Sequence, residues 1–353
     1  MARGRGNIMA DTVVVHLTKC AAQTTIASAR IAKYIATMFD LPLVDQPGLW
    51  QKQYKNIIYV NSMGAFAPPE LRLELAQQAR ACDKLIYVQN DYNVHPISQV
   101  QKVVRDERGW SHDFPFTTGD IYLWSTVPDY CCKPGDRYIN WNALTFNEAV
   151  PNALLRGAQP AVLFYWGACR PGRLGAFRRL LLGVDSVKRG PVVISCAGKV
   201  QRKFLEAAGD CVLTHPQRPY TPDHVDFCRP FKDLGELAAY GATVYMEDEA
   251  SHYVYTSPAN RFYEALSVGL FMYVDEAAVH TLTQAGYVVP AEWTVTSLEG
   301  IQRAGMPVPE EWQAQQKSMW VPNAIKEREG LDSALIQAME ELEPARRQKH
   351  ASF

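Results

Sequence analysis

An arginine and a glutamate lie three residues apart in a segment that reads as the start of a helix. Arg261 and Glu264 belong to the stretch 257–269, which leads through small residues and Gly269 into an apolar run. Residues three apart on a helix share one face, so both side chains can point into the same cleft. The carboxylate can accept hydrogen bonds from ribose hydroxyls while the guanidinium binds phosphate. The competing interpretation is a surface salt bridge within one helix, which would carry no function.

A second group of basic residues follows an apolar run near the middle of the chain. Gly167 comes directly after the run 161–166, and Arg170 and Arg173 follow it at the start of a helical pattern. A glycine-bearing turn at a helix N-terminus exposes backbone N–H groups, which bind a diphosphate together with the helix dipole. The two arginines add donors that are always ionised. Arginines that are merely solvated, or paired with acidic residues, are the alternative.

An aspartate ends an apolar run in the first half of the chain. The run 85–89 is followed by Asn90 and Asp91. An acid at the carboxyl end of a parallel strand faces the ligand-binding edge of the sheet, where it can take the proton of an attacking hydroxyl. Two alternatives stay open. Asp91 caps the following turn, or His95 is the base, because its ordinary pKa suits proton transfer.

Apolar runs alternate with amphipathic stretches along the chain, which predicts alternating strands and helices with parallel sheets. Strands are expected at Thr12–His16, Asn56–Val60, Lys84–Gln89, Asp120–Ser125, Ala161–Gly167, Val192–Gly198, Ala242–Glu247 and Leu270–Asp275. Helices are expected at Thr25–Phe39, Pro69–Cys82, Gly172–Leu182, Gln201–Ala208 and Pro258–Val268. The predicted fold class is therefore α/β, with two Rossmann-like, doubly wound domains.

The chain is too long for one ordinary domain. Irregular hydrophobicity over 140–160 places the connection there, which gives a first domain at 1–150 and a second at 151–330. Open α/β sheets bind ligands beyond the carboxyl ends of their strands, so a central cleft is expected between the two domains. A charged amphipathic helix at Asp332–Leu342, within the segment 331–353, is expected to pack back on the first domain by analogy with other two-lobed folds.

The order of these residues resembles GT-B glycosyltransferases, and most of all the DNA β-glucosyltransferases of T-even phages. The resemblance rests on the ordered set Asp91, Arg170, Arg261 and Glu264. It implies a GT-B fold and an inverting transfer of glucose from UDP-glucose to a hydroxymethylated pyrimidine base of phage DNA, with base flipping. It also implies that Asp91 is the general base and that Glu264 binds the ribose. The diphosphate ligands would be Arg170, Arg173 and Arg261, although the spacing of Arg173 differs from the family pattern by one residue.

The resemblance also points to residues for the sugar and for the nucleotide base. In GT-B enzymes the loop after the first strand lies over the sugar, and the phage enzymes carry a glutamate there. This chain offers Gln23 or Thr24 instead, so the identity of the sugar is not fixed. The nucleotide base would be read after the strand 225–228, near Arg229 and Phe231, a position that follows from the fold rather than from a motif.

Basic and aromatic residues are interleaved between the predicted strands of the first half. Lys102, Arg105, Trp110 and His112 lie within 101–116. Such a mixture suits a phosphate backbone and an extruded base, which an enzyme acting on a duplex must unstack. Together with Asn61, which ends the strand before that of Asp91, these four residues are the candidates for binding an acceptor. A solvated helix face is the alternative explanation of the basic residues.

Composition narrows the class of protein. The 353 residues include 36 basic and 37 acidic ones, so the overall charge does not indicate a nucleic-acid partner. Eight cysteines without C-x-x-C spacing predict reduced thiols and neither a zinc site nor a disulfide framework. No Asp-x-Asp motif assigns a metal, so a requirement for Mg²⁺ or Mn²⁺ is tied to no motif. No apolar run approaches the ~18 residues of a membrane span.

From these observations we expect a monomeric cytoplasmic enzyme, in the host cytoplasm if phage-encoded, whose partners are a nucleotide sugar and double-stranded DNA. Two other functions are compatible with the sequence. A GT-B enzyme with a small-molecule, glycan or protein acceptor would not show salt-sensitive DNA binding. A GT-B relic that binds nucleotide or DNA without transfer would be unaffected by Asp91→Asn.

Overall fold

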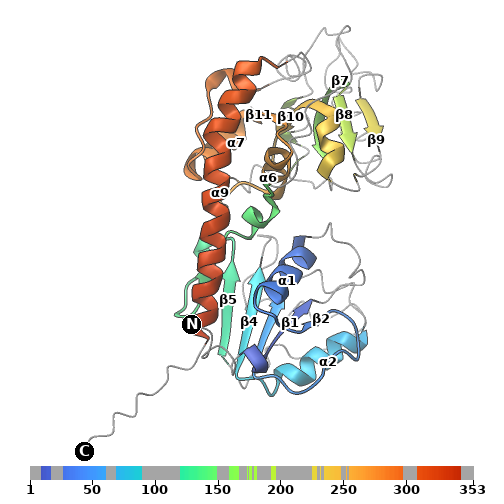
Figure 1. Ribbon diagram of the computed structural model, residues 1–353, viewed down its shortest axis with the longest axis vertical. Helices are drawn as coiled ribbons and strands as arrows, with labels where there is room; N and C mark the ends of the chain where they lie inside the picture. The colour runs from blue at the N-terminus through green and yellow to red at the C-terminus, as the bar shows by residue number, and fades with distance from the viewer. Residues whose placement is uncertain are drawn as a thin grey trace, which may run out of the picture. The chain divides into compact units, whose positions relative to one another are not determined.

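The chain divides into two compact units in the computed structural model. Unit 1 is Met1–Trp141 together with Leu331–Phe353, and unit 2 is Asn142–Gly330. The structure describes residues 9–16, 27–60, 69–89, 120–148, 159–166, 173, 175–176, 179–180, 192–195, 225–228, 231, 234–247, 252, 254–296 and 308–342. Each unit is built on a six-stranded sheet whose strands are all parallel (Figure 1).

The sheet of unit 1 has the strand order β2-β1-β3-β4-β5-β6. Its strands are β1 (Thr12–His16), β2 (Leu43–Val44), β3 (Asn56–Val60), β4 (Lys84–Gln89), β5 (Asp120–Ser125) and β6 (Arg137–Tyr138). Its helices are α1 (Ala27–Met38) and α2 (Pro69–Ala79), with the 3-10 helices η1 (Met9–Asp11), η3 (Pro128–Tyr130) and η4 (Trp141–Thr145), the last of which crosses into unit 2. The order reverses between β1 and β3, as in doubly wound sheets of the flavodoxin type.

Both faces of the unit 1 sheet are buried. Val13 and Ile57 pack into one apolar cluster with Leu71 and Leu75 of α2. The residues of opposite phase on the same strands are equally covered, as Val14 shows with 0% exposure. This burial explains why the strands read as continuous apolar runs, since a parallel sheet is normally covered on both sides.

Acid is expected to destabilise unit 1 through His16, the last residue of β1. His16 is buried, and its Nε2 lies 3.0 Å from the Ser28 hydroxyl of α1. Burial lowers the pKa of His16 to about 4 from an ordinary 6.5, so the unfolded chain binds a proton that the folded chain does not. The free energy of unfolding is therefore highest above pH 6.5, where His16 is neutral in both states, and it decreases as the pH falls towards 4. The decrease amounts to about 3 kcal/mol.

Urea unfolding at several pH values measures this effect. Between pH 6.5 and 4, the free energy of unfolding should fall less steeply for His16→Gln than for the parent. Equal slopes for the two proteins would show that His16 is not the group that titrates.

The sheet of unit 2 has the strand order β12-β11-β10-β7-β8-β9. Its strands are β7 (Gln159–Trp166), β8 (Val192–Ser195), β9 (Val225–Cys228), β10 (Tyr240–Tyr245), β11 (Phe271–Asp275) and β12 (Thr294–Val295). Its helices are α6 (Asn260–Ser267), α7 (Glu276–Gln284) and part of α9 (Glu310–Glu341), with the 3-10 helices η6 (Leu234–Ala239) and η8 (Ala291–Trp293). The described residues among 173–180 are also helical.

Helix α9 begins at Glu310, well before the Asp332 at which the sequence predicted a helix. Its first part belongs to unit 2 and its last turns to unit 1. Pro322 interrupts the helical pattern of the sequence, but packing of aromatic side chains holds the helix in place there. Trp320 is 0% exposed, and its ring contacts those of Phe262 and Trp293. Over the part of the chain that the structure describes, no helix combines the length and the apolar character needed to cross a membrane.

Candidate functional site

The order of the strands in unit 2 reverses between β7 and β10. From β7 the chain adds β8 and β9 on one side, and then returns to add β10, β11 and β12 on the other. Open parallel sheets bind ligands at such a switch point, beyond the carboxyl ends of the strands. Trp166 is the last residue of β7, and Glu247 lies two residues after the end of β10. These two residues therefore mark the edge at which a ligand is expected.

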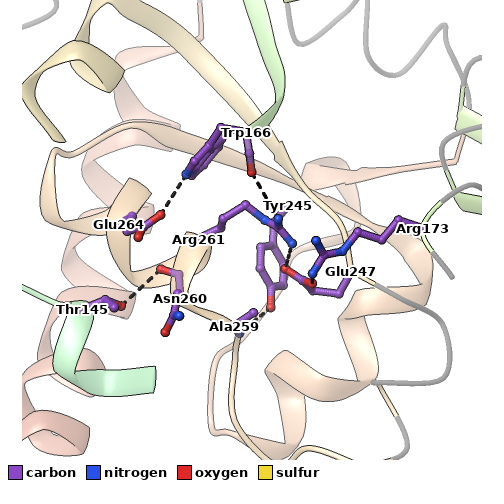
Figure 2. Close-up of polar contacts among 9 residues, drawn as sticks. All are labelled: Thr145, Trp166, Arg173, Tyr245, Glu247, Ala259, Asn260, Arg261 and Glu264. Carbon is purple, nitrogen blue, oxygen red and sulfur yellow. Dashed lines mark hydrogen bonds and ion pairs between the residues drawn. The ribbon is translucent and has the colours of Figure 1, made fainter. Parts of the chain in front are cut away.

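Five side chains meet at this edge, and we call them the switch-point cluster: Trp166, Arg173, Glu247, Arg261 and Glu264 (Figure 2). Arg261 donates from Nη2 to Glu247 Oε1 and from Nη1 to the Trp166 carbonyl oxygen, the latter at 3.2 Å. Arg173 Nη2 donates to Glu247 Oε2 at 2.7 Å. The indole N–H of Trp166 donates to Glu264 Oε2 at 2.8 Å. The cluster is thus one continuous polar network.

Helix α6 carries Arg261 and Glu264, and both of its ends are fixed by local contacts. At its start, the Ala259 N–H donates to the Tyr245 hydroxyl at 2.9 Å, which ties the first turn to the end of β10. At its end, Gly269 has a φ of 71°, a left-handed conformation that glycine adopts without strain. The chain can therefore turn from α6 directly into β11. Arg261 and Glu264 thus lie in the first two turns of a short helix that is tied to β10 at its start.

Glu247 is a buried carboxylate between two guanidinium groups. The side chains of Glu247, Arg173 and Arg261 are 7%, 11% and 13% exposed. Burial on its own would raise the pKa of Glu247, but the charges and hydrogen bonds of Arg261 and Arg173 outweigh burial and hold the pKa below its ordinary value. Glu247 is therefore ionised at neutral pH. Breaking a buried ion pair by removing one partner typically costs about 3–5 kcal/mol, so the arrangement is held strongly.

Comparison with solved structures identifies the fold of the chain. The chain matches no protein-family model and no curated protein sequence. The T4 phage BGT in complex with UDP and Mn²⁺ superimposes with a TM-score of 0.63 at 13% identity, over 93% of this chain and 99% of that one. The T4 phage BGT in complex with UDP-glucose gives a TM-score of 0.62 at 14% identity, over the same shares of the two chains. The chain has the GT-B fold.

The GT-B fold confirms the fold class that the sequence predicted, and the T4 phage BGT structures share that fold over most of this chain. At this level of identity the comparison speaks for the fold alone. Unit 2, with its Rossmann strand order, carries the switch-point cluster. The predicted roles of individual residues rest on the geometry of that cluster and on the sequence.

Three of the predicted donor-site residues, Arg173, Arg261 and Glu264, are brought together in this GT-B chain. Phe231 is not brought to them. Its ring lies 6.0 Å from that of Tyr240, the first residue of β10 and thus at the opposite end of the strand from the cluster. The other predicted site residues lie outside the described part of the chain: Gln23, Thr24, Asn61, Asp91, His95, Lys102, Arg105, Trp110, His112, Gly167, Arg170 and Arg229.

Two members of the cluster, Glu247 and Trp166, had no predicted role. Glu247 is the acidic residue at the end of the apolar run 242–246, a signal similar to the one that singled out Asp91 in the first half. Trp166 ends its strand in the same way. The missing information was the strand order, because only the adjacency of β7 and β10 brings these two positions together.

A separate ion pair lies at the end of β11. Arg179 donates from Nη1 and Nη2 to the two carboxylate oxygens of Asp275, at 2.8 and 2.9 Å. Asp275 is 0% exposed and immediately precedes α7, whose N-terminus also favours a negative charge. The pair ties the helical segment after β7 to the neighbouring part of the sheet. We assign it a structural role.

A metal site does not emerge from the described residues. Among the residues that the structure describes, no three His, Cys, Asp or Glu side chains lie close enough together to hold a metal ion.

Proposed function

We propose that this GT-B chain is an inverting glycosyltransferase that moves glucose from UDP-glucose to a hydroxymethylated pyrimidine base in double-stranded phage DNA. The switch-point cluster carries the proposal, because it places two fixed guanidinium groups and a carboxylate at the ligand-binding edge of unit 2. The structural neighbours support the donor, since they were solved with UDP or UDP-glucose. The DNA acceptor is supported by the sequence resemblance.

In this proposal the donor is held by unit 2. Arg261 and Arg173, with Arg170 and the turn at Gly167, bind the diphosphate, because guanidinium groups match phosphate oxygens in charge and geometry. Glu264 accepts hydrogen bonds from the ribose hydroxyls. The Trp166 indole N–H supports this role by fixing the orientation of the Glu264 carboxylate.

The transfer is a single displacement at the anomeric carbon. The hydroxyl oxygen of the acceptor base forms the new bond to that carbon while the bond to the diphosphate oxygen breaks, so UDP leaves with the electron pair. Asp91 takes the proton of the attacking hydroxyl as general base. Arginine charge stabilises the negative charge that develops on the leaving diphosphate. Attack from the face opposite the leaving group inverts the configuration of the sugar.

The acceptor and the sugar are assigned to residues of the first half. Gln23 or Thr24 contacts the sugar, and Asn61, Lys102, Arg105, Trp110 and His112 bind the duplex and the extruded base. Basic contacts to phosphate make DNA binding fall steeply with salt concentration. Salt-sensitive retention of duplex DNA therefore separates this proposal from an enzyme with a small-molecule, glycan or protein acceptor.

One experiment tests the function as a whole. The protein is incubated with a panel of nucleotide sugars and with duplexes containing hydroxymethylcytosine, hydroxymethyluracil or only unmodified bases, and the digested nucleosides are analysed by mass spectrometry. We expect the mass of one hexose to be added to a hydroxymethylated base and to no unmodified base. If no donor is consumed with any acceptor, the transferase proposal is wrong. Sugar consumption without modified nucleosides would contradict the DNA acceptor alone.

Glu264→Ala is expected to abolish the preference of the protein for UDP over 2′-deoxy-UDP. In the parent, a charged acceptor on the ribose hydroxyls should favour UDP by about tenfold, the usual size of one charge-assisted hydrogen bond. Without the carboxylate the two nucleotides should bind alike. Isothermal titration of both nucleotides measures the preference.

Glu276→Ala is the matched control for this prediction. Glu276 is an exposed glutamate in the first turn of α7, in the same unit as Glu264. This variant should keep the preference for UDP. If Glu264→Ala also keeps it, the proposed ribose contact is not made by Glu264.

A further inference from the structure

We propose that Glu247 is a positioning residue for the donor diphosphate, because it sets the separation and the orientation of Arg173 and Arg261. The proposal rests on the proposed function, since it concerns the same donor site. Glu247 itself need not touch the donor. It acts through the two arginines that do.

The geometry gives Glu247 this place. Arg173 lies in the helical segment after β7, whereas Arg261 lies in the first turn of α6, so the two arginines come from different elements. Each oxygen of the Glu247 carboxylate accepts a hydrogen bond from a different one of them. Figure 2 shows the carboxylate lying between the two guanidinium groups. One side chain therefore links two cations that come from different elements.

Glu247 can hold the arginines because its own position is rigid. It follows the end of β10 by two residues, and the intervening Met246 is 1% exposed. Tyr245, the last residue of the strand, is buried and is bonded to the start of α6. Arg261 is also held at its second terminal nitrogen, by the Trp166 carbonyl oxygen. A guanidinium group held at both terminal nitrogens is fixed in its plane, which is the preorganisation that recognition of a diphosphate needs.

Two electrostatic effects of Glu247 on the donor oppose one another. Without the carboxylate, the two buried guanidinium groups would repel each other and separate, so the diphosphate would have to bring them back. The carboxylate itself, however, repels the diphosphate. Our proposal is that the first effect is the larger, and the sign of the change in UDP affinity on its removal decides between them.

The test compares the binding of UDP, UMP and uridine to the full chain by isothermal titration. Glu247→Gln keeps the size of the side chain and removes its charge. We expect UDP to bind at least about tenfold more weakly to this variant, UMP to be affected less, and uridine to change by less than about twofold. A loss that grows with the number of phosphates identifies a positioning role, because general damage to unit 2 would weaken all three ligands together. In turnover assays the KM for the donor should rise more than kcat falls.

Asp275→Asn provides the matched control. It removes the charge of another buried carboxylate of unit 2 that pairs with an arginine, Arg179. Affinity for all three ligands should be unchanged in this variant, even if its thermal unfolding temperature falls. A similar loss of UDP affinity in Asp275→Asn and Glu247→Gln would overturn the proposal.

Glu247→Asp keeps the proposal testable if Glu247→Gln does not fold. Aspartate retains the charge but is shorter by one methylene group, so it cannot span both guanidinium groups in the same way. Its UDP affinity should lie between those of the parent and Glu247→Gln, or clearly below the parent if only this variant folds. Parent-like or tighter UDP binding by either variant would overturn the inference and leave the proposed function standing. Failure of the parent to bind UDP would overturn both.

Discussion

Asp91→Asn is expected to lower turnover by about 1,000-fold while UDP-glucose binds with the affinity of the parent. The amide has nearly the size of the carboxylate but cannot accept the proton of the attacking hydroxyl. Since the donor is assigned to unit 2, the loss should appear in kcat and not in the affinity for the donor. Single-turnover measurement of hexose transfer, combined with UDP-glucose titration, separates the two quantities.

His95→Gln tests the rival base in the same assay. If Asp91 is the base, this variant should retain most of the turnover, and the turnover of the parent should not decline as the pH falls through the ordinary pKa of histidine, about 6.5. A large loss in His95→Gln together with a small loss in Asp91→Asn would transfer the role to His95. If neither variant loses turnover, the single-displacement mechanism lacks its base and has to be revised.

The strands that lie deep in the two sheets could be predicted from the sequence. Thr12–His16 and Lys84–Gln89 have the bounds that their apolar runs predicted. The reason is that a parallel strand covered on both faces must be apolar throughout, so its pattern marks both of its ends. The edge strand Leu43–Val44 was missed, because two residues are too few to form a pattern.

Only those residues of the candidate site that are related by local spacing in the sequence could be predicted together. Arg261 and Glu264 are three residues apart on α6, so a shared face follows from helical geometry alone. Glu247 lies 74 residues from Arg173 and 14 from Arg261, and no local rule relates those positions. Their meeting depends on the pairing of β10 with β7. A charged residue at the end of an apolar run can be recognised in the sequence, whereas the residue that it pairs with cannot.

Arg261→Met is expected to weaken UDP binding by about 100-fold, because a charged, oriented donor to the diphosphate is replaced by an apolar side chain of similar length. Unit 2 should lose less stability than on removal of the sole arginine partner of a buried carboxylate, since Glu247 keeps its hydrogen bond from Arg173. UDP titration and urea unfolding of the same variant measure the two effects. Arg261→Lys, which keeps the charge but not the planar fork, should bind UDP with intermediate affinity.

Arg179→Met should lower the stability of unit 2 without lowering the affinity for UDP, which is the opposite of the result expected for Arg261→Met. The comparison tests whether the switch-point cluster binds the donor or only stabilises unit 2. Arg179→Met leaves the Asp275 carboxylate, which is 0% exposed, without the guanidinium group that now pairs with it, so the free energy of unfolding should fall by about 3 kcal/mol. Its UDP affinity, measured where the variant is folded, should stay within about twofold of the parent. Ligand binding and stability thus respond to different arginines of one unit. If both variants lost stability and UDP affinity in parallel, the switch-point cluster would be a structural ion-pair network rather than a donor site.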